Sequence, residues 1–568
     1  MKRYLLQNPI ISSITILLVV LSSLATVYVA ILLQQVIDLA TKNDFSEFTK
    51  VITTTIIYFI LLGILKYTSS LFSKKLIRQI TQNMRKDAFF GIMNKSISKF
   101  TEVNSGDYLS LLSNDIKLIE ENYLNPMLLI LSNIAAFIGT LVLILFYSPL
   151  IAVYLFIALL LMFVVPGLIG KSLQRKQNNL IKQYASFTKK IKDYFSGFEV
   201  INSYNMKDYI KESFQKENTK LATSKYDADR FIALNESISD ILATVSMLSV
   251  IFIAAYLVLI GNITVGTLVA LIQLSSFFVN PVMIIMQNFP KISGTKTILD
   301  RLKEHAKESQ LPINESFDKN ISFNNELLVN NLSFSYKPEK NVLNNISLSF
   351  KKGKKYAIVG PSGCGKSTLI KIISGSYSDY SGDIFYDDLN LKMIENSCLN
   401  NIVSVLHQNV YLFDASFYFN ICLHNNYSYE SFNSSLYFSG LEEFIQENTI
   451  DTTDYHFPVG ENGTNLSGGQ KQRIAFARSV IREPQILILD EGTSSLDIKT
   501  SRDIETKLLS LRGTTVISIT HKINEEVLNK YDEVIYIENG KVIEQGSFDN
   551  LITKSGLFSK FYNSQYAT

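Results

Sequence analysis

The chain has 568 residues, 47% of them hydrophobic, and a formal net charge of +3 at pH 7. This length exceeds what one hydrophobic core serves, so two or more domains are expected. The nearly balanced charge argues against a nucleic-acid partner. Three cysteines without metal-ligand spacing fit a reducing compartment better than a disulfide framework.

Long apolar runs dominate residues 1–302, which we predict to be an all-α transmembrane domain lying in a lipid bilayer. A helix needs about 20 mostly apolar residues to cross the hydrocarbon layer. The first run follows Met1-Lys2-Arg3 but is too long for the apolar region of a signal peptide. Six runs reach the required length, at about 10–33, 51–72, 126–147, 149–170, 238–260 and 266–289.

Basic residues predict the orientation of these helices. Lysine and arginine gather in the segments that follow the second and fourth runs, while the opposite connections are short and hold few of them. By the positive-inside tendency, both segments, the two termini and the soluble half are cytoplasmic. We therefore expect a multi-pass cell-membrane protein. Its Lys-, Asn- and Ile-rich composition suggests a bacterial plasma membrane.

The two long cytoplasmic segments continue the helical pattern of the spans. Each is interrupted near its middle, at 104–107 and at 196–199. This pattern predicts helices that leave the membrane, turn through a short transverse helix and return. The alternative is a solvated charged loop, although unstructured loops of this length are uncommon in compact proteins.

The sixth predicted helix carries one polar stripe. Spacings of three, four and seven place its members on one helical face: Gln273, Ser276, Asn280 and Gln287. Polar groups in hydrocarbon are costly unless they face protein or water. We hypothesise that the stripe lines a water-accessible substrate cavity. Amide hydrogen bonds between helices would explain the same stripe.

After a predicted linker at 303–322, residues 323–568 show the strands, glycine turns and amphipathic helices of an α/β domain. A strand at 355–359 leads into a glycine-rich G-x-x-x-x-G-K-S loop and then a helix, as in phosphate-binding loops. Backbone N–H groups and the helix N-terminus would hold the phosphates of ATP. Lys366 should reach the β- and γ-phosphates, and Ser367 should bind Mg²⁺. The predicted ATP-binding residues are Gly360, Pro361, Ser362, Gly363, Cys364, Gly365, Lys366, Ser367 and Thr368.

The apolar run 486–489 ends in two acids, Asp490 and Glu491. Such a run is typical of a buried parallel strand, and nucleotides bind at the carboxyl ends of these strands. Asp490 would then hold the Mg²⁺ shell, and Glu491 would act as the general base for the attacking water. The alternative is that these residues are only two solvated acids at the end of a strand.

A second candidate anion site precedes these acids. Ser467, Gly468, Gly469 and Gln470 follow Leu466 and open a helix whose N-terminus would attract phosphate. Because the domain already contains one phosphate loop, the second site suggests contact with the nucleotide of another subunit.

The order of these three motifs resembles that of the ATP-binding cassette (ABC) superfamily, and the six predicted helices resemble the membrane half of its exporters. The five-residue stretch Leu466–Gln470 is highly specific to this superfamily. The resemblance implies that Tyr336 stacks on adenine and that Gln408 touches the metal and γ-phosphate. It also implies that Asp497 acts across a dimer and that His521 contacts the γ-phosphate. Exporters often carry Glu-Arg-Gly before the signature, where this chain has Glu461-Asn462-Gly463.

The resemblance implies an ATPase that drives export. Two chains would sandwich ATP between Lys366 of one and Ser467 of the other, with Glu491, His521 and Gln408 as catalytic residues and ATP with Mg²⁺ bound. The transported cargo would be a peptide, a lipid or an amphipathic drug-like small molecule. A homodimer is favoured, while the catalytic member of a heterodimer remains an alternative. A membrane-anchored ATP-dependent switch is the alternative from another functional class.

Overall fold

The computed structural model describes residues 2–42, 45–308, 321–336, 341–442, 444–445, 455–490, 498–520 and 525–566. Contacts divide the chain into two compact units. The first contains Met1–Asn94 and Asn104–Gln310, and the second contains Lys95–Val103 and Leu311–Thr568. The short helix α4 (Ile97–Thr101) therefore groups with the second unit, although the sequence on both sides of it belongs to the first.

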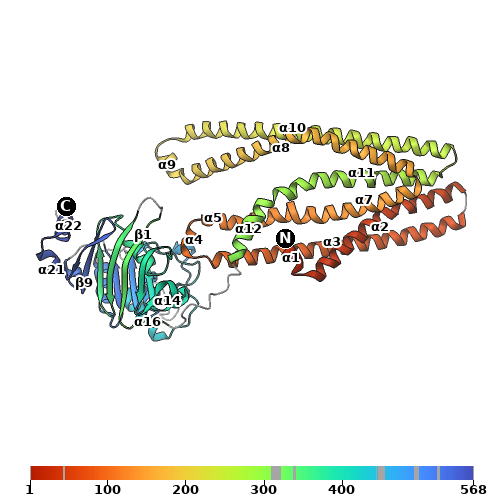
Figure 1. Ribbon diagram of the computed structural model, residues 1–568. Coiled ribbons are helices and arrows are strands. Elements are labelled where there is room, and N and C mark those ends of the chain that lie inside the picture. The colour runs from red at the N-terminus through yellow and green to blue at the C-terminus, as the bar shows by residue number, and fades with distance from the viewer. Residues whose placement is uncertain are drawn as a thin grey trace. The chain divides into compact units, whose positions relative to one another are not determined.

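Long helices build the first unit, as Figure 1 shows. The predicted spans coincide with parts of six long helices among the described residues, and only the fifth, 238–260, extends one residue beyond its helix: α2 (Pro9–Lys42), α3 (Phe45–Met93), α7 (Asn125–Tyr147), α8 (Pro149–Ser196), α10 (Lys207–Leu259) and α11 (Val265–Gly294). A short helix, α1 (Lys2–Leu6), precedes them. Within the described residues, five helices are long and apolar enough to cross a membrane. In α8 the apolar stretch Pro149–Leu160 begins the fourth predicted span, and the side chains of 161–170 lie outside the described part.

Short connections join neighbouring helices. The Ser148 hydroxyl accepts a hydrogen bond from the backbone N–H of Ile151, and Pro149 follows at the start of α8. Proline suits the first helical turn because no intrahelical partner exists there for an N–H. Thr264 caps α11 in the same way, by accepting from the N–H of Thr267. These caps fix the two tight hairpins between α7 and α8 and between α10 and α11.

Short helices occur at both predicted interruptions, where a solvated loop was the alternative. The helix α9 (Phe198–Ser203) joins α8 and α10 at the tip of a long arm (Figure 1). In the other segment α4 is followed by α5 (Ser105–Ser110), whose first turn is capped by the Asn104 side chain. The helical chain then continues through the π-helical turns η1 (Leu111–Asp115) and η2 (Glu120–Leu124), separated by α6 (Ile116–Ile119), into α7.

The predicted linker 303–322 begins too early, because its first residues are helical. Helix α12 spans Lys296–Glu308. Its residues Leu299, Leu302 and Ala306 are buried at helical spacing, so an amphipathic face packs within the first unit. Arg301 also forms an ion pair with the buried Asp115 of η1. These contacts extend the helix into a polar sequence that would otherwise favour a linker.

Two sheets, counted within the described residues, build the second unit. The antiparallel sheet has the order β2-β1-β4-β5, with β1 (Glu326–Phe334), β2 (Leu343–Lys351), β4 (Ser381–Tyr386) and β5 (Leu389–Asn390). The larger sheet has the order β10-β9-β3-β8-β7-β6. It contains β3 (Lys355–Val359), β6 (Val403–Leu406), β7 (Ile486–Asp490), β8 (Thr515–Ile519), β9 (Glu533–Glu538) and β10 (Lys541–Gly546). All its strands are parallel except the edge strand β10.

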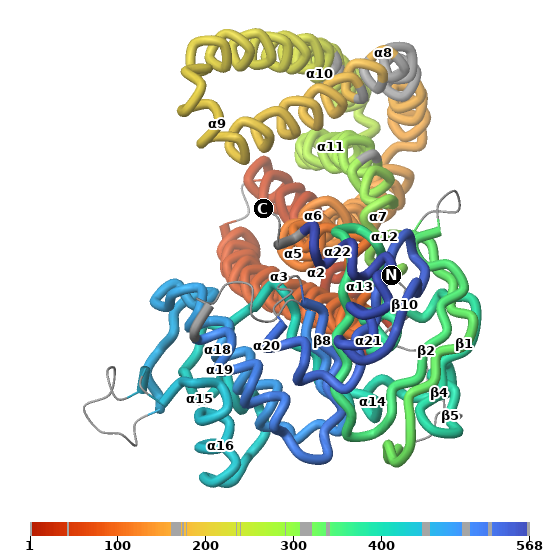
Figure 2. The backbone as a smooth tube through the Cα atoms, turned by 90° about the vertical axis from the view of Figure 1, so that its left-hand side faces the viewer, coloured from red at the N-terminus to blue at the C-terminus, as the bar shows by residue number. Residues whose placement is uncertain are grey.

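Helices cover both faces of the larger sheet. Successive side chains of a strand point to opposite faces. In β7, Ile486 and Ile488 join a core with α13 (Lys366–Ile373), whereas Leu487 and Leu489 join a core with α18 (Gly468–Val480). Figure 2 accordingly shows α13 and α18 well apart. The remaining helices are η3 (Leu391–Met393), α14 (Asn396–Ile402), α15 (Phe417–Cys422), α16 (Tyr429–Ser439), η4 (Glu461–Gly463), α19 (Ile498–Leu509), α20 (Glu525–Leu528), α21 (Phe548–Thr553) and α22 (Leu557–Tyr566).

Candidate nucleotide site and transport cavity

The glycine-rich loop follows β3, whose five residues are all buried. Gly360 has φ +154° and Gly365 has φ +107°, in the region that side chains rarely occupy. A Cβ at Gly360 would also collide with the carbonyl oxygen of Ile537 on β9. The glycines therefore allow the backbone to bend closely over the sheet, and α13 begins directly behind the loop at Lys366.

Lys366 is held inside this loop, with only 4% of its surface exposed. Its Nζ donates hydrogen bonds to the carbonyl oxygens of Gly360 at 2.8 Å and Pro361 at 2.9 Å. The third neighbour is Cys364 Sγ at 3.8 Å, and sulfur is a weak acceptor. One donor of the ammonium is thus poorly used. A phosphate oxygen would satisfy it better.

Ser367, in the first turn of α13, contacts Asp490 at the end of β7. Ser367 Oγ donates a hydrogen bond of 2.8 Å to Oδ1 of Asp490, which is 7% exposed at the end of β7. Hydroxyl and carboxylate oxygens are ligands that Mg²⁺ prefers, usually together with waters and substrate phosphates. Among the described residues, no cluster of three or more His, Cys, Asp or Glu side chains could hold a metal alone. This pair fits a magnesium ion that the nucleotide shares.

Tyr336 lies beside the start of α13. Its hydroxyl is 3.1 Å from Thr368 Oγ1, and 53% of the residue is exposed. The rings of Phe334 and Tyr377 meet it edge to face, at centroid distances of 5.0 and 5.8 Å. An exposed, supported ring next to a phosphate loop suits stacking on a base. The sequence pattern did not indicate Tyr377, because it lies outside every motif.

The other predicted residues of the nucleotide site fall into two groups. Gln408 is exposed and follows β6, the neighbour of β7, so it lies at the same edge of the sheet as Asp490. Glu491, Asp497 and His521 lie outside the described residues. Their predicted roles therefore stay predictions.

Ser467 and Gln470 cap α18 reciprocally. Ser467 Oγ accepts from the N–H of Gln470 at 3.3 Å, and Gln470 Oε1 accepts from the N–H of Ser467 at 2.8 Å. This capping box occupies the Gln470 side chain. Ser467 and Gly468 are exposed, and no neighbouring atom lies within 4 Å of a Cβ position at Gly468. The N-terminus of α18 is thus open to an incoming group.

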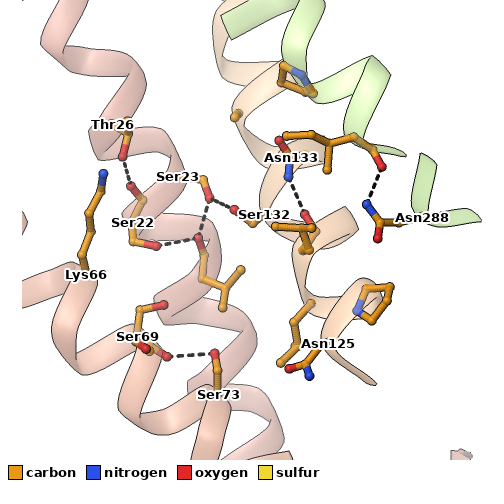
Figure 3. Close-up of a pocket in the computed structure, with 18 of the residues that line it drawn as sticks. Ser22, Ser23, Thr26, Lys66, Ser69, Ser73, Asn125, Ser132, Asn133 and Asn288 are labelled. Atoms are coloured by element: carbon orange, nitrogen blue, oxygen red, sulfur yellow. Dashed lines mark hydrogen bonds between the residues drawn. The ribbon is translucent and has the colours of Figure 1, made fainter. Parts of the chain in front are cut away.

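A cavity of about 770 Å³ lies in the first unit among α2, α3, α7 and α11, with Glu121 of η2 also in its wall. Figure 3 shows serine, threonine and asparagine side chains around it. Asn280 belongs to this wall together with Phe277, Pro281, Ile284 and Asn288. Gln273, Ser276 and Gln287 are absent from the described wall, which uses a face of α11 rotated from the predicted stripe.

Comparisons with known proteins agree with this architecture. The family model of the ABC transporter transmembrane region matches residues 12–282, and the ABC transporter model matches residues 343–494. An uncharacterized ABC transporter ATP-binding protein, YwjA of Bacillus subtilis, is 29% identical over 88% of this chain and 87% of its own length. The ATP-dependent lipid A-core flippase of Shigella flexneri is 26% identical over 89% and 87%, respectively.

The fold also has a solved counterpart. The structure of a bacterial Atm1-family ABC exporter with ATP bound matches with a TM-score of 0.83 at 18% identity, over 98% of each chain. The chain belongs to the ABC transporter family, as a half-transporter that joins a helical transmembrane domain to an ATPase domain. Its ATPase activity is coupled to transport across the membrane.

Proposed function

We propose that two copies of this chain form an exporter that moves an amphipathic cargo, such as a lipid, a peptide or a drug-like molecule. The observation that carries the proposal is the placement of two phosphate-binding features in one ATPase unit. The loop before α13 and the open N-terminus of α18 belong to helices on opposite faces of one sheet. One chain would therefore carry the two halves of a nucleotide site on separate helices.

In this proposal the phosphate loop of one copy holds ATP. Lys366 and the backbone of Gly360–Ser367 bind its phosphates, and Tyr336 stacks on the base. Ser367, Asp490 and Gln408 would hold Mg²⁺, which neutralises charge on the phosphates. The hydroxyl–carboxylate contact of 2.8 Å already brings two of these ligands together.

The second copy completes the site with Ser467, Gly468 and Gly469. Backbone N–H groups at a helix N-terminus favour an anion, and the capping box fixes the first turn of α18 in position. ATP would then bind between two chains and hold them together. Asp497 would act across the same interface.

Hydrolysis needs a base for the attacking water. Glu491 follows Asp490 directly and would accept the proton of that water. Gln408 and His521 would orient the water and the γ-phosphate. Loss of the γ-phosphate removes the charge-assisted contacts between the copies, so each cycle would close and reopen the dimer.

The motion would reach the membrane through α4 and α9, which we assign as coupling helices. The ATPase unit and both termini would lie in the cytoplasm of a bacterial cell, as the basic segments indicate. Fusion of both halves in one chain favours export, since importers usually encode them separately. The relative named as a lipid A-core flippase supports a lipid among the possible cargoes.

Reconstitution into liposomes tests the proposal. The purified chain should form dimers and move a fluorescent phospholipid or amphipathic dye only with ATP and Mg²⁺, and Lys366→Ala should abolish this movement. ATP hydrolysis without movement of any probe would favour the membrane-anchored switch. Activity that appears only after a second, related chain is added would assign this chain to a heterodimer.

A further inference from the structure

The wall of the cavity in the helix bundle combines charged, polar and apolar side chains. Lys74, Glu121 and Asn125 belong to it, and Asn125 is near the bottom of Figure 3. Hydroxyl groups of α2 and α3 contribute further polar atoms. Apolar side chains contribute the rest of the wall: Val19, Val27, Leu128, Leu129, Phe277 and Ile284. Such a cavity suits a molecule with a polar head and an apolar tail.

Two lysines of α3 face this cavity. Lys66 lies within the apolar span 51–72, and Lys74 lies just beyond it. They are about 12 Å apart along the helix axis, at a rise of 1.5 Å per residue. Across the part of the chain that the structure describes, neither forms an ion pair. A charged group inside a membrane segment is costly and commonly marks a ligand pathway.

The acid in the wall does not neutralise these lysines. Glu121 Oε1 lies 3.8 Å from Nζ of Lys117, one helical turn away on the same helical segment. The wall therefore carries two cations and one acid that already has a cationic neighbour. Its net charge favours an anion.

Four hydroxyl groups of the wall act as acceptors toward the cavity, because their protons are already used. Ser22 and Ser23 both donate to the carbonyl oxygen of Val19, Thr26 donates to that of Ser22, and Ser73 donates to that of Ser69. Figure 3 shows these bonds as dashed lines. A hydroxyl that donates once still accepts through its lone pairs. A matching headgroup would therefore bring its own donors.

We infer that this cavity binds an anionic amphiphile through its headgroup, with Lys66 and Lys74 pairing with the anion and the serine and threonine oxygens accepting from headgroup hydroxyls or amines. This inference rests on the proposed transport function and specifies its cargo class. A volume of about 770 Å³ accommodates one headgroup and the start of its apolar tail. A phosphate ester with hydroxyls has the required chemistry.

The absence of tryptophan from the sequence permits a direct binding assay. Phe277→Trp places a single indole in the cavity wall, and Phe146→Trp, at an α7 position that is 83% exposed, provides the matched control. The full chain in phosphatidylcholine nanodiscs is titrated with phosphatidylglycerol, whose headgroup combines a phosphate with hydroxyls. We expect a saturable change in emission from Phe277→Trp and none from Phe146→Trp.

Lysine variants in the Phe277→Trp background test the recognition. Lys66→Gln with Lys74→Gln should weaken the apparent affinity for phosphatidylglycerol by about tenfold or more, as expected for the loss of charge-assisted hydrogen bonds. Lys75→Gln, which changes a neighbouring charge outside the wall, should leave the affinity within about twofold. Unchanged affinity in the double variant, or an equal loss in Lys75→Gln, would overturn the inference.

Competition with inorganic phosphate distinguishes two sources of the bound anion, a lipid headgroup and the free phosphate ion. Displacement of phosphatidylglycerol by millimolar phosphate would support recognition of the phosphate group itself, and no displacement would support recognition of the lipid-borne headgroup.

The transport assay separates this inference from the proposed function. Binding that does not depend on the two lysines, in a protein that transports its probe, refutes the binding site and leaves the proposed function standing. Lysine-dependent binding in a protein that moves no probe supports the site and refutes the exporter.

Discussion

Backbone geometry shapes the nucleotide site, whereas side chains from distant parts of the sequence form the wall of the cavity in the helix bundle. Gly360–Ser367 forms one continuous loop whose lysine is bonded to its own carbonyl groups. The wall of the cavity instead comes from α2, α3, α7 and α11, and several of its hydroxyl groups donate hydrogen bonds within their own helices. A short motif therefore specifies the first site, while only tertiary packing reveals the second.

This difference has a consequence for mutation. In the ATPase unit one altered side chain removes a defined chemical role, so large effects on turnover are expected. In the bundle a single change removes one of many contacts, and smaller, cargo-dependent effects are expected.

Replacement of Glu491 by Gln should lower ATP turnover by about 10²- to 10⁴-fold, the usual contribution of general base catalysis. ATP binding should persist, because the amide keeps the size of the side chain and removes only its basicity. Measurement of steady-state hydrolysis beside equilibrium binding of labelled ATP checks both. Turnover close to that of the unmodified chain would exclude Glu491 as the base.

Loss of the Ser367 hydroxyl should weaken the binding of Mg²⁺ and leave the stacking of the base unchanged. We expect Ser367→Ala to raise the Mg²⁺ concentration for half-maximal ATPase activity by about 10- to 100-fold, the range seen when groups around a metal are removed. Ser362→Ala, a serine of the same loop that the magnesium assignment does not use, is the matched control. An equal rise in both variants would contradict the assignment of Ser367 to the metal.

The cap of α18 should contribute to stability independently of ATP. Ser467→Ala removes the acceptor for the Gln470 N–H and should cost about 1 kcal/mol of unfolding free energy in the ATPase unit. Ser467→Asn retains a capping oxygen and should lose much less. Thermal unfolding without nucleotide checks this order. Equal stability of all three proteins would show that the cap contributes little.

The arm formed by α8 and α10 should loosen at low pH. Hydrogen bonds from Lys190 and then Lys220 hold the pKa of Glu217 below its ordinary value. Since its pKa is lowered on folding, this contact stabilises the arm above about pH 4.3 and is lost as the pH falls through the folded value. Lys190 is on α8, so the contact joins two helices.

Spin-label distances between α8 and α10 should therefore broaden on acidification. Glu217→Gln should remove this dependence. Glu212→Gln should retain it, because within the described residues Glu212 forms its ion pair with Lys216 of the same helix. A pH response that is the same in both variants would assign the change to other groups.

The contrast between the two sites also explains what the sequence could predict. Strand and helix patterns around Gly360–Ser367 and Asp490 are local, so the α/β fold and the adjacency of Ser367 and Asp490 follow from them. Apolar length predicts six spans, and five helices of the described residues are long and apolar enough to cross a membrane. Tyr377 could not be found in this way, because only tertiary packing places its ring against Tyr336.

Predictions were weakest where neighbouring helices decide the structure. Spacing places Gln273, Ser276, Asn280 and Gln287 on one face of α11, but packing chooses which face borders the cavity, and only Asn280 lies in the described wall. Lys66 of α3 also lies in the wall, and no sequence motif indicates this position. The polar residues after 302 indicated a linker, but burial of Leu302 and Ala306 continues α12.

Cross-linking between copies tests the central claim most directly. Ser362→Cys and Ser467→Cys are introduced on separate, differently tagged copies that lack the native cysteines and carry Glu491→Gln; both positions are exposed in the described chain. We predict a disulfide between the two tags that forms with ATP and Mg²⁺ and is absent without nucleotide. A nucleotide-independent yield, or no cross-link although ATP is bound, would contradict the account that ATP joins the phosphate loop of one chain to α18 of another.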